Sequence, residues 1–201
     1  MLLSTAEDIA AFVQELQLES DRGLPLIATS LIDELLRETL RAFFLETKST
    51  EYLIDEGNAP LGTFSARIHT CFALGLINEY EKSESQLLRK VRNLFAHNKH
   101  GFSFADAKVV GLCSSLKSDL PNDDRYDQNN ARFRFINASV CLVLRLYHRP
   151  DWVALQRRTL LDCVDNHPTQ WRSFDTDPPP AGQAYIAIGQ HGVKVEQTDK
   201  E

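Results

Sequence analysis

The sequence lacks the features that would place it in several specialised classes. No apolar run approaches the roughly 20 residues that a bilayer span requires, and the start, Met1 to Thr5, has neither the basic region nor the apolar core of a signal peptide. A Gly-rich phosphate loop, a nucleophile elbow and a dinucleotide fingerprint are also missing. We therefore expect a cytoplasmic chain without membrane attachment, and we predict no cofactor.

Positive charge is also scarce. The 22 Lys and Arg residues are outnumbered by 28 Asp and Glu residues, which gives a net charge of −6. Proteins that bind duplex DNA usually carry a basic excess, because neutralising phosphates supplies most of the non-specific affinity. Direct, specific DNA binding is therefore not expected, although the total charge is compatible with a small local footprint.

Cysteine is sparse and widely spaced. The chain has 4 cysteines: Cys71, Cys113, Cys141 and Cys163. No two of them have the spacing of metal ligands. The first three fall in apolar, helix-like stretches. They are interpreted as free thiols in a reducing compartment rather than as disulfides.

Apolar residues recur at helical spacing over most of the chain, which predicts an all-α fold. With 201 residues, 43% hydrophobic and 25% charged, the sequence is typical of one globular domain. Thr5 and Asp8 form an approximate capping box for a first helix, and Pro25 falls in the first turn of a second. Further helices are predicted over 63–77, 85–97, 104–116, 131–148 and 152–164, with loops at 55–62 and 118–130.

Three residue patterns add detail to these helices. The second helix has an apolar stripe of Ile27, Leu31, Leu35, Leu36, Leu40, Phe43 and Phe44. The helix over 63–77 is rich in small residues, Gly75 among them, which are expected to let a neighbouring backbone come close. Pro150 is expected to stop the helix over 131–148.

The composition changes after His167. We therefore predict a helical domain over residues 1–167 and a Pro-rich linker with a tail over 168–201. In the tail, Ala184–Ile188 and Val193–Val195 flank the segment Gly189–Gly192, which is a weak hairpin signal. The predicted fold class is a single-domain multi-helix bundle with a short extended or hairpin-like C-terminal tail.

Three segments together resemble the mannitol operon repressor family. They are Leu26–Leu36; Pro60–Ile68 continuing to Ala73–Ile77; and Leu88–His97. The stretch Gly-Thr-Phe-Ser-Ala-Arg-Ile in the second segment is the most specific, and the likeness covers about residues 5–150. The resemblance implies an all-helical fold and the repression of an operon. It marks four structural or binding residues: Gly62, Ser65, Arg67 and Arg89. Of these, Arg67 is expected to form a buried ion pair that ties helices together.

Members of this family lack an evident helix-turn-helix, and the sequence agrees. The best candidate is Ala73 to Asn98, but its turn is too long and its second helix is committed to core packing. Repression is then expected to work through a protein partner, and a homodimer is the default expectation for such a regulator.

Arg92 and His97 also fit the short Arg-x4-His motif of HEPN domains, a helical superfamily in which many members are metal-independent ribonucleases acting as dimers. A His can move protons between a 2′-hydroxyl and a leaving oxygen, and an Arg can hold the scissile phosphate. Asn93 would orient either group. On an ideal helix Arg92 and His97 lie roughly 140° apart, opposite the core residues. Under this alternative the partner is RNA and the chain is an endoribonuclease; otherwise it is not an enzyme.

A purely structural interpretation of these residues is also open. Arg92 would pair with a carboxylate such as Glu34 or Glu38, and His97 would cap the helix C-terminus. A metal site from His97, His100 and Asp106 is a weaker alternative, so no metal is predicted. The remaining basic residues of the C-terminal half are interpreted as a solvated face rather than a nucleic-acid stripe: Arg132, Arg134, Arg145, Arg149, Arg157 and Arg158.

Overall fold

The computed structural model describes residues 5–97, 101–118, 127, 129–160, 181–182, 184–189 and 192–197. Contacts divide the chain into two compact units, Met1–Thr159 and Leu160–Glu201. The described part of the first unit is helical throughout, so the predicted all-α class is confirmed. Its elements are α1 (Ala6–Leu18), α2 (Gly23–Phe43), α3 (Lys48–Ile54), α4 (Phe64–Ala73), α5 (Glu79–His97), α6 (Ala107–Ser114), α7 (Ala131–Leu146) and α8 (Arg149–Ala154).

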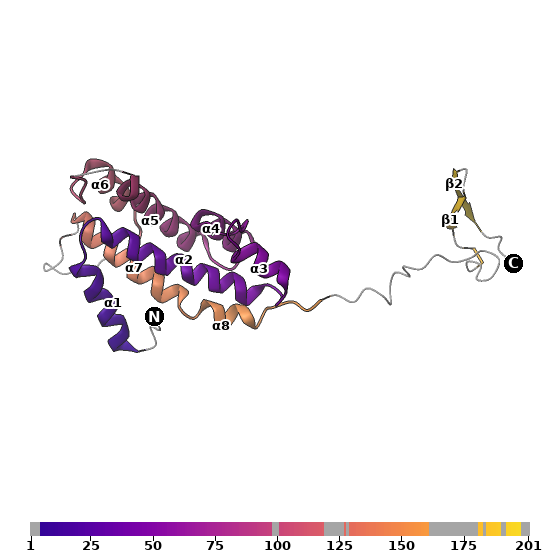
Figure 1. The fold of residues 1–201 in the computed structure, drawn as a ribbon, viewed down its shortest axis with the longest axis horizontal. Coiled ribbons are helices and arrows are strands. Elements are labelled where there is room, and N and C mark those ends of the chain that lie inside the picture. Colours follow the sequence, from indigo (N-terminus) through magenta and orange to yellow (C-terminus); the bar gives the residue numbers. More distant parts are fainter. Residues whose placement is uncertain are drawn as a thin grey trace. The chain divides into compact units, whose positions relative to one another are not determined.

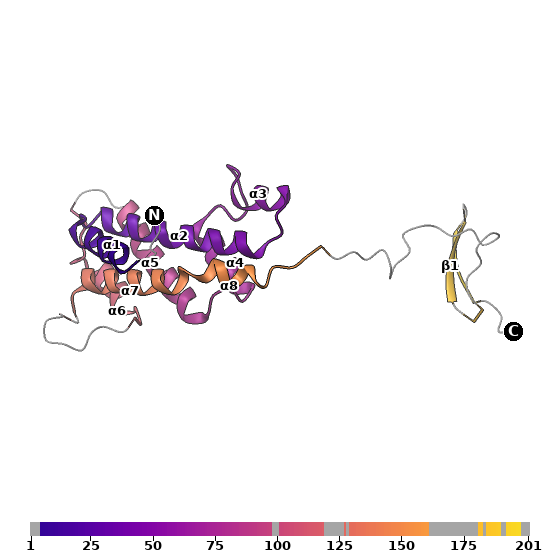
Figure 2. The same ribbon diagram turned by 90° about the horizontal axis from the view of Figure 1, so that it is seen from below.

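The long helix α2 is the central element of this unit. It packs against α1, α3, α4, α5, α7 and α8, and Figures 1 and 2 show α7 and α8 following one another along its length. Its fully buried residues include Ala28, Ile32 and Leu36. The predicted apolar stripe includes Leu36 but also Ile27 and Leu31, which are only half-buried. Because several helices cover α2, its buried face is wider than one stripe.

The predicted caps define several helix ends. Thr5 and Asp8 form the expected capping box of α1, and Pro25 lies in the first turn of α2. Helix α5 begins earlier than predicted, because Asn78 and Glu81 form a second capping box: each side chain accepts the other's backbone N–H, at 2.9 Å in both directions.

Helix α4 ends earlier than predicted. We had interpreted Gly75 as a small residue that lets a neighbouring helix approach, but an added Cβ there would meet nothing within 4 Å. Its φ of +72° instead places it in the left-handed region, which glycine adopts without strain. The N–H groups of Gly75 and Leu76 return to the carbonyls of Phe72 and Cys71. Gly75 therefore terminates the helix.

Three further boundaries differ from the prediction. Helix α3 was not predicted at all, and α6 is shorter than the expected 104–116. Pro150 was expected to stop the preceding helix; it lies instead in the first turn of α8, where a missing N–H costs little. Helix α8 ends at Ala154, and residues 161–164 of the helix predicted over 152–164 lie outside the described part.

An aromatic cluster closes one end of the core. The ring of Phe95 lies 5.1 Å from that of Phe102 and 5.0 Å from that of Phe104, and Phe104 lies 5.5 Å from Phe135. These side chains come from α5, α7 and the segment before α6. The cluster therefore joins elements that are distant in sequence.

As predicted, no disulfide joins the cysteines that the structure describes. Cys71 and Cys113 are buried and Cys141 is half-buried, while Cys163 lies outside the described residues. Burial raises the pKa of both Cys71 and Cys113 to about 12. These two thiols therefore stay protonated and unreactive at neutral pH.

The second unit contains an antiparallel hairpin of β1 (Ala184–Gly189) and β2 (Gly192–Gln197), in which Ile186 pairs with Val195. This is the hairpin that the tail sequence suggested. Within the described part of the chain, no helix combines the length and the apolar character needed to cross a bilayer.

Candidate functional site

The residues predicted from the sequence lie on two neighbouring helices, α4 and α5 (Figure 1). Ser65 and Arg67 belong to the start of α4, Gly62 lies just before its N-cap, and the remaining ones belong to the C-terminal half of α5. Two contacts show how the helices align. His69 Nε2 lies 3.4 Å from Gln86 Nε2, and the Lys82 ammonium lies 4.0 Å from the centre of the Phe72 ring. The helices are therefore antiparallel, with the start of α4 beside the end of α5.

The Arg-x4-His segment presents its polar residues outward. Val91 is fully buried, Arg92 and Asn93 are half-buried, and His97 is exposed. Arg92 donates a hydrogen bond from Nη1 to Oδ1 of Asn93 at 3.1 Å. This orientation leaves the polar groups accessible to a ligand.

The expected pairing of Arg92 with Glu34 or Glu38 is wrong. Both carboxylates are bound by Arg37, which lies on the same helix as they do. Arg37 and Glu34 are three residues apart and are therefore neighbours on the helix surface. His97 lies in the last turn of α5, where a cation is favoured.

Gly62 and Arg67 have structural explanations at the start of α4. A Cβ on residue 62 would lie 2.9 Å from the carbonyl oxygen of Ala59, so only glycine fits without moving backbone. Thr63 then caps the helix by accepting the Ala66 N–H at 3.1 Å. Arg67, whose side chain is 11% exposed, forms an ion pair with Asp33 of α2 at 2.9 Å.

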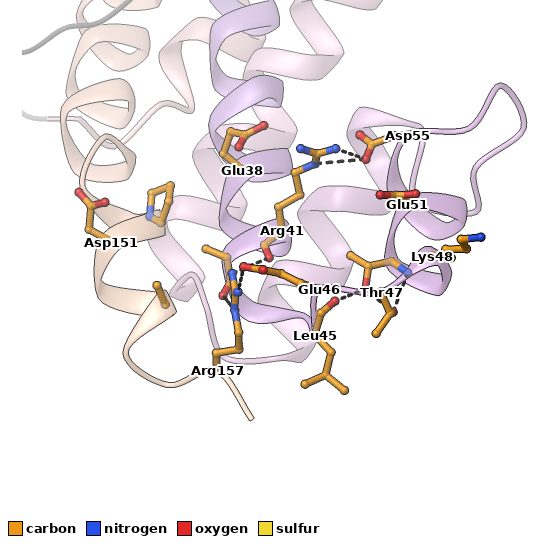
Figure 3. Close-up of a pocket in the computed structure, with 14 residues that line it drawn as sticks. Glu38, Arg41, Leu45, Glu46, Thr47, Lys48, Glu51, Asp55, Asp151 and Arg157 are labelled. Carbon is orange, nitrogen blue, oxygen red and sulfur yellow. Dashed lines mark hydrogen bonds and ion pairs between the residues drawn. The ribbon is translucent and has the colours of Figure 1, made fainter. Parts of the chain in front are cut away.

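A groove of about 720 Å³ lies between the end of α2, the start of α3, and α8 (Figure 3). Small or apolar side chains form part of its lining: Ala42, Leu45, Pro150 and Ala154. Five acidic residues and three basic ones also line it: Glu38, Glu46, Glu51, Asp55 and Asp151, with Arg41, Lys48 and Arg157. The groove is therefore acidic overall.

Internal ion pairs hold two of the three cations of the groove. Arg41 donates from Nε to Asp55 at 3.1 Å, and this hydrogen bond raises the pKa of Arg41. Arg157 binds Glu46 and donates to the Ala42 carbonyl at 2.9 Å. Figure 3 shows both guanidiniums turned towards these partners. The rim then carries the negative charge of Glu51 and of Asp151, which lies 3.7 Å from Nδ1 of His148.

The sequence did not indicate this groove. Its residues come from two stretches that are distant in sequence, 38–55 and 150–157, and helix α3 within the first stretch was not predicted. A usable signal was present in Thr47, which accepts the Thr50 N–H as an N-cap, followed by the acidic Glu51 in the first turn.

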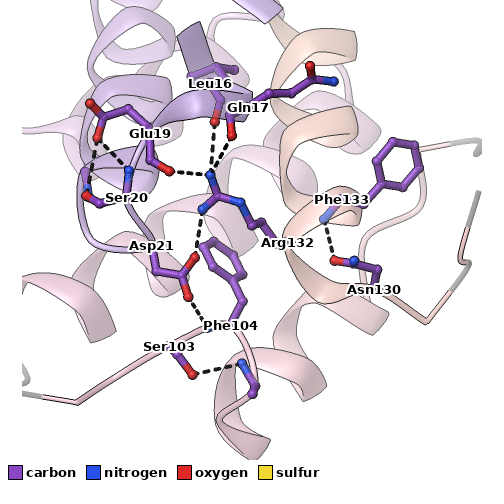
Figure 4. Close-up of polar contacts among 12 residues, drawn as sticks. Leu16, Gln17, Glu19, Ser20, Asp21, Ser103, Phe104, Asn130, Arg132 and Phe133 are labelled. Carbon is purple, nitrogen blue, oxygen red and sulfur yellow. Dashed lines mark hydrogen bonds and ion pairs between the residues drawn. The ribbon is translucent and has the colours of Figure 1, made fainter. Parts of the chain in front are cut away.

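Four arginines that we had predicted on a solvated face bind helix ends instead. Figure 4 shows the Arg132 guanidinium between the carbonyls of Leu16, Gln17 and Glu19 at the end of α1 and the carboxylate of Asp21, which lies at 2.8 Å. Arg134 donates to the carbonyls of Cys113 and Leu116, beside the end of α6. In the same way Arg149 binds the Leu76 carbonyl, at 2.8 Å, and Arg157 that of Ala42.

The two remaining arginines of this group, Arg145 and Arg158, are exposed. The Arg145 guanidinium lies 4.8 Å from the centre of the Tyr80 ring.

The metal alternative involved His97, His100 and Asp106. Asp106 accepts the Ser103 N–H at 2.7 Å, whereas His100 lies outside the described residues. Within the described ranges, no three His, Cys, Asp or Glu side chains are grouped as metal ligands would be.

Comparisons with known proteins agree on one family. The sequence model of the family described as mannitol repressor (MtlR) matches residues 9–135. The mannitol operon repressors of two Escherichia coli strains, K12 and O6:H1, are each 27% identical over 99 residues, which is 47% of this chain and 51% of theirs. The chain thus spans about half the length of the curated relatives it matches.

Two solved structures share the fold. A chain in the X-ray structure of the MtlR–HPr complex from Escherichia coli superposes with a TM-score of 0.55 at 20% identity, covering 69% of this chain and 98% of that one. YggD of Shigella flexneri, described as a possible transcriptional regulator, gives 0.53 at 14% identity, covering 74% and 98%. At these identities the likeness concerns the fold alone.

Proposed function

The chain belongs to the mannitol repressor family, and from that membership we propose that it is a repressor-type regulator of a carbohydrate-related operon that binds a protein partner. The match over residues 9–135 carries this proposal, because it spans α2, α4 and α5 together with the motif residues between them. A regulator of transcription works in the cytoplasm of a bacterium, and there we place it.

The arrangement of α4 and α5 supports a partner rather than a classical DNA-binding motif. The two helices are joined by residues 74–78, which is longer than the three- or four-residue turn of a helix-turn-helix. Helix α5 buries Leu88, Val91 and Phe95 in the core. The net charge of −6 also opposes a large phosphate footprint.

The partner class that we propose is an HPr-type protein that docks through a basic face on the acidic groove of α2, α3 and α8. The related MtlR of Escherichia coli has been solved in complex with HPr. The groove supports this assignment through its volume, its small apolar lining residues and its excess of acidic side chains. Complementary charge of this kind steers association and selects partners.

Calorimetric titration of the purified chain with HPr from the same organism tests the proposal. We expect saturable heat of binding and, in a parallel gel-shift assay, no retardation of promoter DNA by the chain alone. A salt-sensitive shift of the DNA by the chain without any partner would contradict the proposal, because it would reveal a DNA-binding surface.

A metal-independent ribonuclease is the second candidate function. The outward placement of Arg92, Asn93 and His97 on α5 favours it. In this case a homodimer would bring two copies of the motif to one RNA. Incubating the pure chain with RNA in a chelator, beside a His97→Ala variant, decides the matter: cleavage by the parent chain alone supports the ribonuclease, and equal or absent cleavage by both chains removes it.

A further inference from the structure

The C-terminal half of α5 is a local exception to the acidic character of the chain. No acidic residue occurs from Ser85 to His97, whereas Arg89, Lys90 and Arg92 all fall in this stretch. Lys90 is exposed, but Arg89 and Arg92 are half-buried. Two positive groups are therefore partly withdrawn from water on one helix.

Neither of these two arginines has a carboxylate partner among the described residues. Arg92 donates only to the neutral amide oxygen of Asn93, and the Nε of Arg89 is buried without an acceptor in the part of the chain that is described. By contrast, the half-buried arginines elsewhere have carboxylates or carbonyls: Arg37, Arg67, Arg132, Arg134, Arg149 and Arg157.

Such a pair of guanidiniums is electrostatically unfavourable while no anion lies between them. Residues three apart on a helix are neighbours, so the two guanidiniums repel one another. Partial burial weakens the screening of that repulsion by water and leaves donors without acceptors. An anion placed between them would relieve both penalties, and guanidinium groups match tetrahedral oxyanions through paired hydrogen bonds.

The start of α4 adds further donors at the same place. In the antiparallel pairing, residue 69 lies beside 86 and residue 72 beside 82. The same alignment brings Ser65 beside Arg89 and the first turn of α4 beside Arg92. The Thr63 side chain takes the Ala66 N–H, whereas the described residues offer no acceptor for the N–H groups of Phe64 and Ser65. These donors lie at the positive end of the helix dipole.

From this convergence we propose that Arg89, Arg92 and the first turn of α4 form a binding site for the phosphate group of a small phosphate monoester. The site goes beyond the proposed partner binding, because it lies on α4 and α5 and shares no residue with the groove. It would make the regulator responsive to a phosphorylated metabolite.

Nuclear magnetic resonance titration of the full chain tests the site directly. The probes are inorganic phosphate, glycerol 3-phosphate and, at matched ionic strength, acetate and glycerol. We expect saturable shifts of the Phe64 and Ser65 amide signals and the Arg89 Nε–H signal with both phosphates, and no saturation with acetate or glycerol. Arg92→Gln should weaken phosphate binding by about tenfold or more, as expected for a lost charge-assisted hydrogen bond.

Lys90→Gln is the matched control, because it removes the same charge from the same helix at an exposed position. We expect it to change the phosphate affinity by no more than about twofold, and His97→Ala to leave the affinity unchanged. Arg89→Gln should weaken phosphate binding as Arg92→Gln does; if that chain does not fold, Arg89→Lys, which keeps the charge but loses the planar fork, tests the same position. Equal weakening by Lys90→Gln and Arg92→Gln would overturn the proposal, as would saturable binding of a single-stranded RNA without any binding of the phosphate probes.

Discussion

At the scale of single residues, arginine side chains bind the C-terminal carbonyls of several helices. The last carbonyls of a helix lack intrahelical partners and lie at the negative end of its dipole. Arg132 of α7 satisfies three such carbonyls of α1 while also binding Asp21. Arg134 lies on α7 as well, Arg149 is the first residue of α8, and Arg157 follows α8. This part of the chain therefore binds the ends of earlier helices.

Arg132→Ala should therefore destabilise the protein well beyond the effect of a surface mutation. The substitution leaves the end of α1 without donors and Asp21 without its cation. We expect a loss of about 2–3 kcal/mol in the free energy of unfolding, which is moderated by the partial exposure of the side chain. Urea denaturation followed by circular dichroism measures it.

Arg158→Ala provides the comparison, because this exposed arginine makes no contact within the described part of the chain. Its free energy of unfolding should stay within about 0.5 kcal/mol of the parent value. If the two variants unfold at the same urea concentration, the bonds made by Arg132 contribute nothing measurable to stability.

At the scale of elements, local sequence signals such as capping residues predicted which helices exist better than they predicted where the helices end. The Thr5 capping box and Pro25 announced helix starts correctly, because these residues act on their own turn. Gly75 and Pro150 were misjudged, because their role depends on the backbone around them: the same glycine can permit close packing or end a helix. Helix α3 has only seven residues and too few apolar positions to show a period.

The candidate site was likewise predicted only in part. Of the residues that the resemblance marked, Ser65, Arg67 and Arg89 lie on two helices that prove to be neighbours, and Gly62 lies just before the first of them. The groove could not be foreseen, because it depends on which helix ends meet in space. The arginines of the C-terminal half were also misjudged, because the sequence pattern of spaced arginines is the same whether they face water or another helix. Arg134, for example, donates to the carbonyl of Cys113.

Helix α8 illustrates how a short element can be essential to the bundle. Its Arg149 binds both the Leu76 carbonyl and Glu81, a carboxylate whose side chain is only 2% exposed. A chain ending at His148 would leave that carboxylate buried without its cation, and would lose the buried Val153 and the Arg157 cap of α2. We expect this chain to lose about 4 kcal/mol or more in the free energy of unfolding.

A chain ending at Leu160 retains all of these contacts and is the appropriate reference. Guanidinium denaturation of the two truncated chains, followed by circular dichroism at the helical band, compares them on one scale. Coincident unfolding curves would show that α8 is dispensable, contrary to the role assigned to Arg149.

At the scale of the whole helical unit, charge is segregated rather than evenly spread. The groove of α2, α3 and α8 has an excess of acidic residues, whereas the charged residues at the end of α5 are all basic. A net charge of −6 conceals this division. The two surfaces therefore suit ligands of opposite charge: a basic protein on the groove and a small anion on α4 and α5.

Reversing charge on the groove rim separates a docking role from a general effect of net charge. In a chain carrying Glu51→Lys and Asp151→Lys, both of them exposed positions, we expect the dissociation constant for HPr to rise by about tenfold at low salt. The difference should shrink at high salt, because screening shortens the reach of rim charges. A chain carrying Glu7→Lys and Glu15→Lys has the same net charge but alters exposed positions of α1, and it should bind like the parent. Equal weakening in both double variants would mean that HPr senses only total charge, while unchanged binding in the rim variant would place its docking surface elsewhere on the molecule.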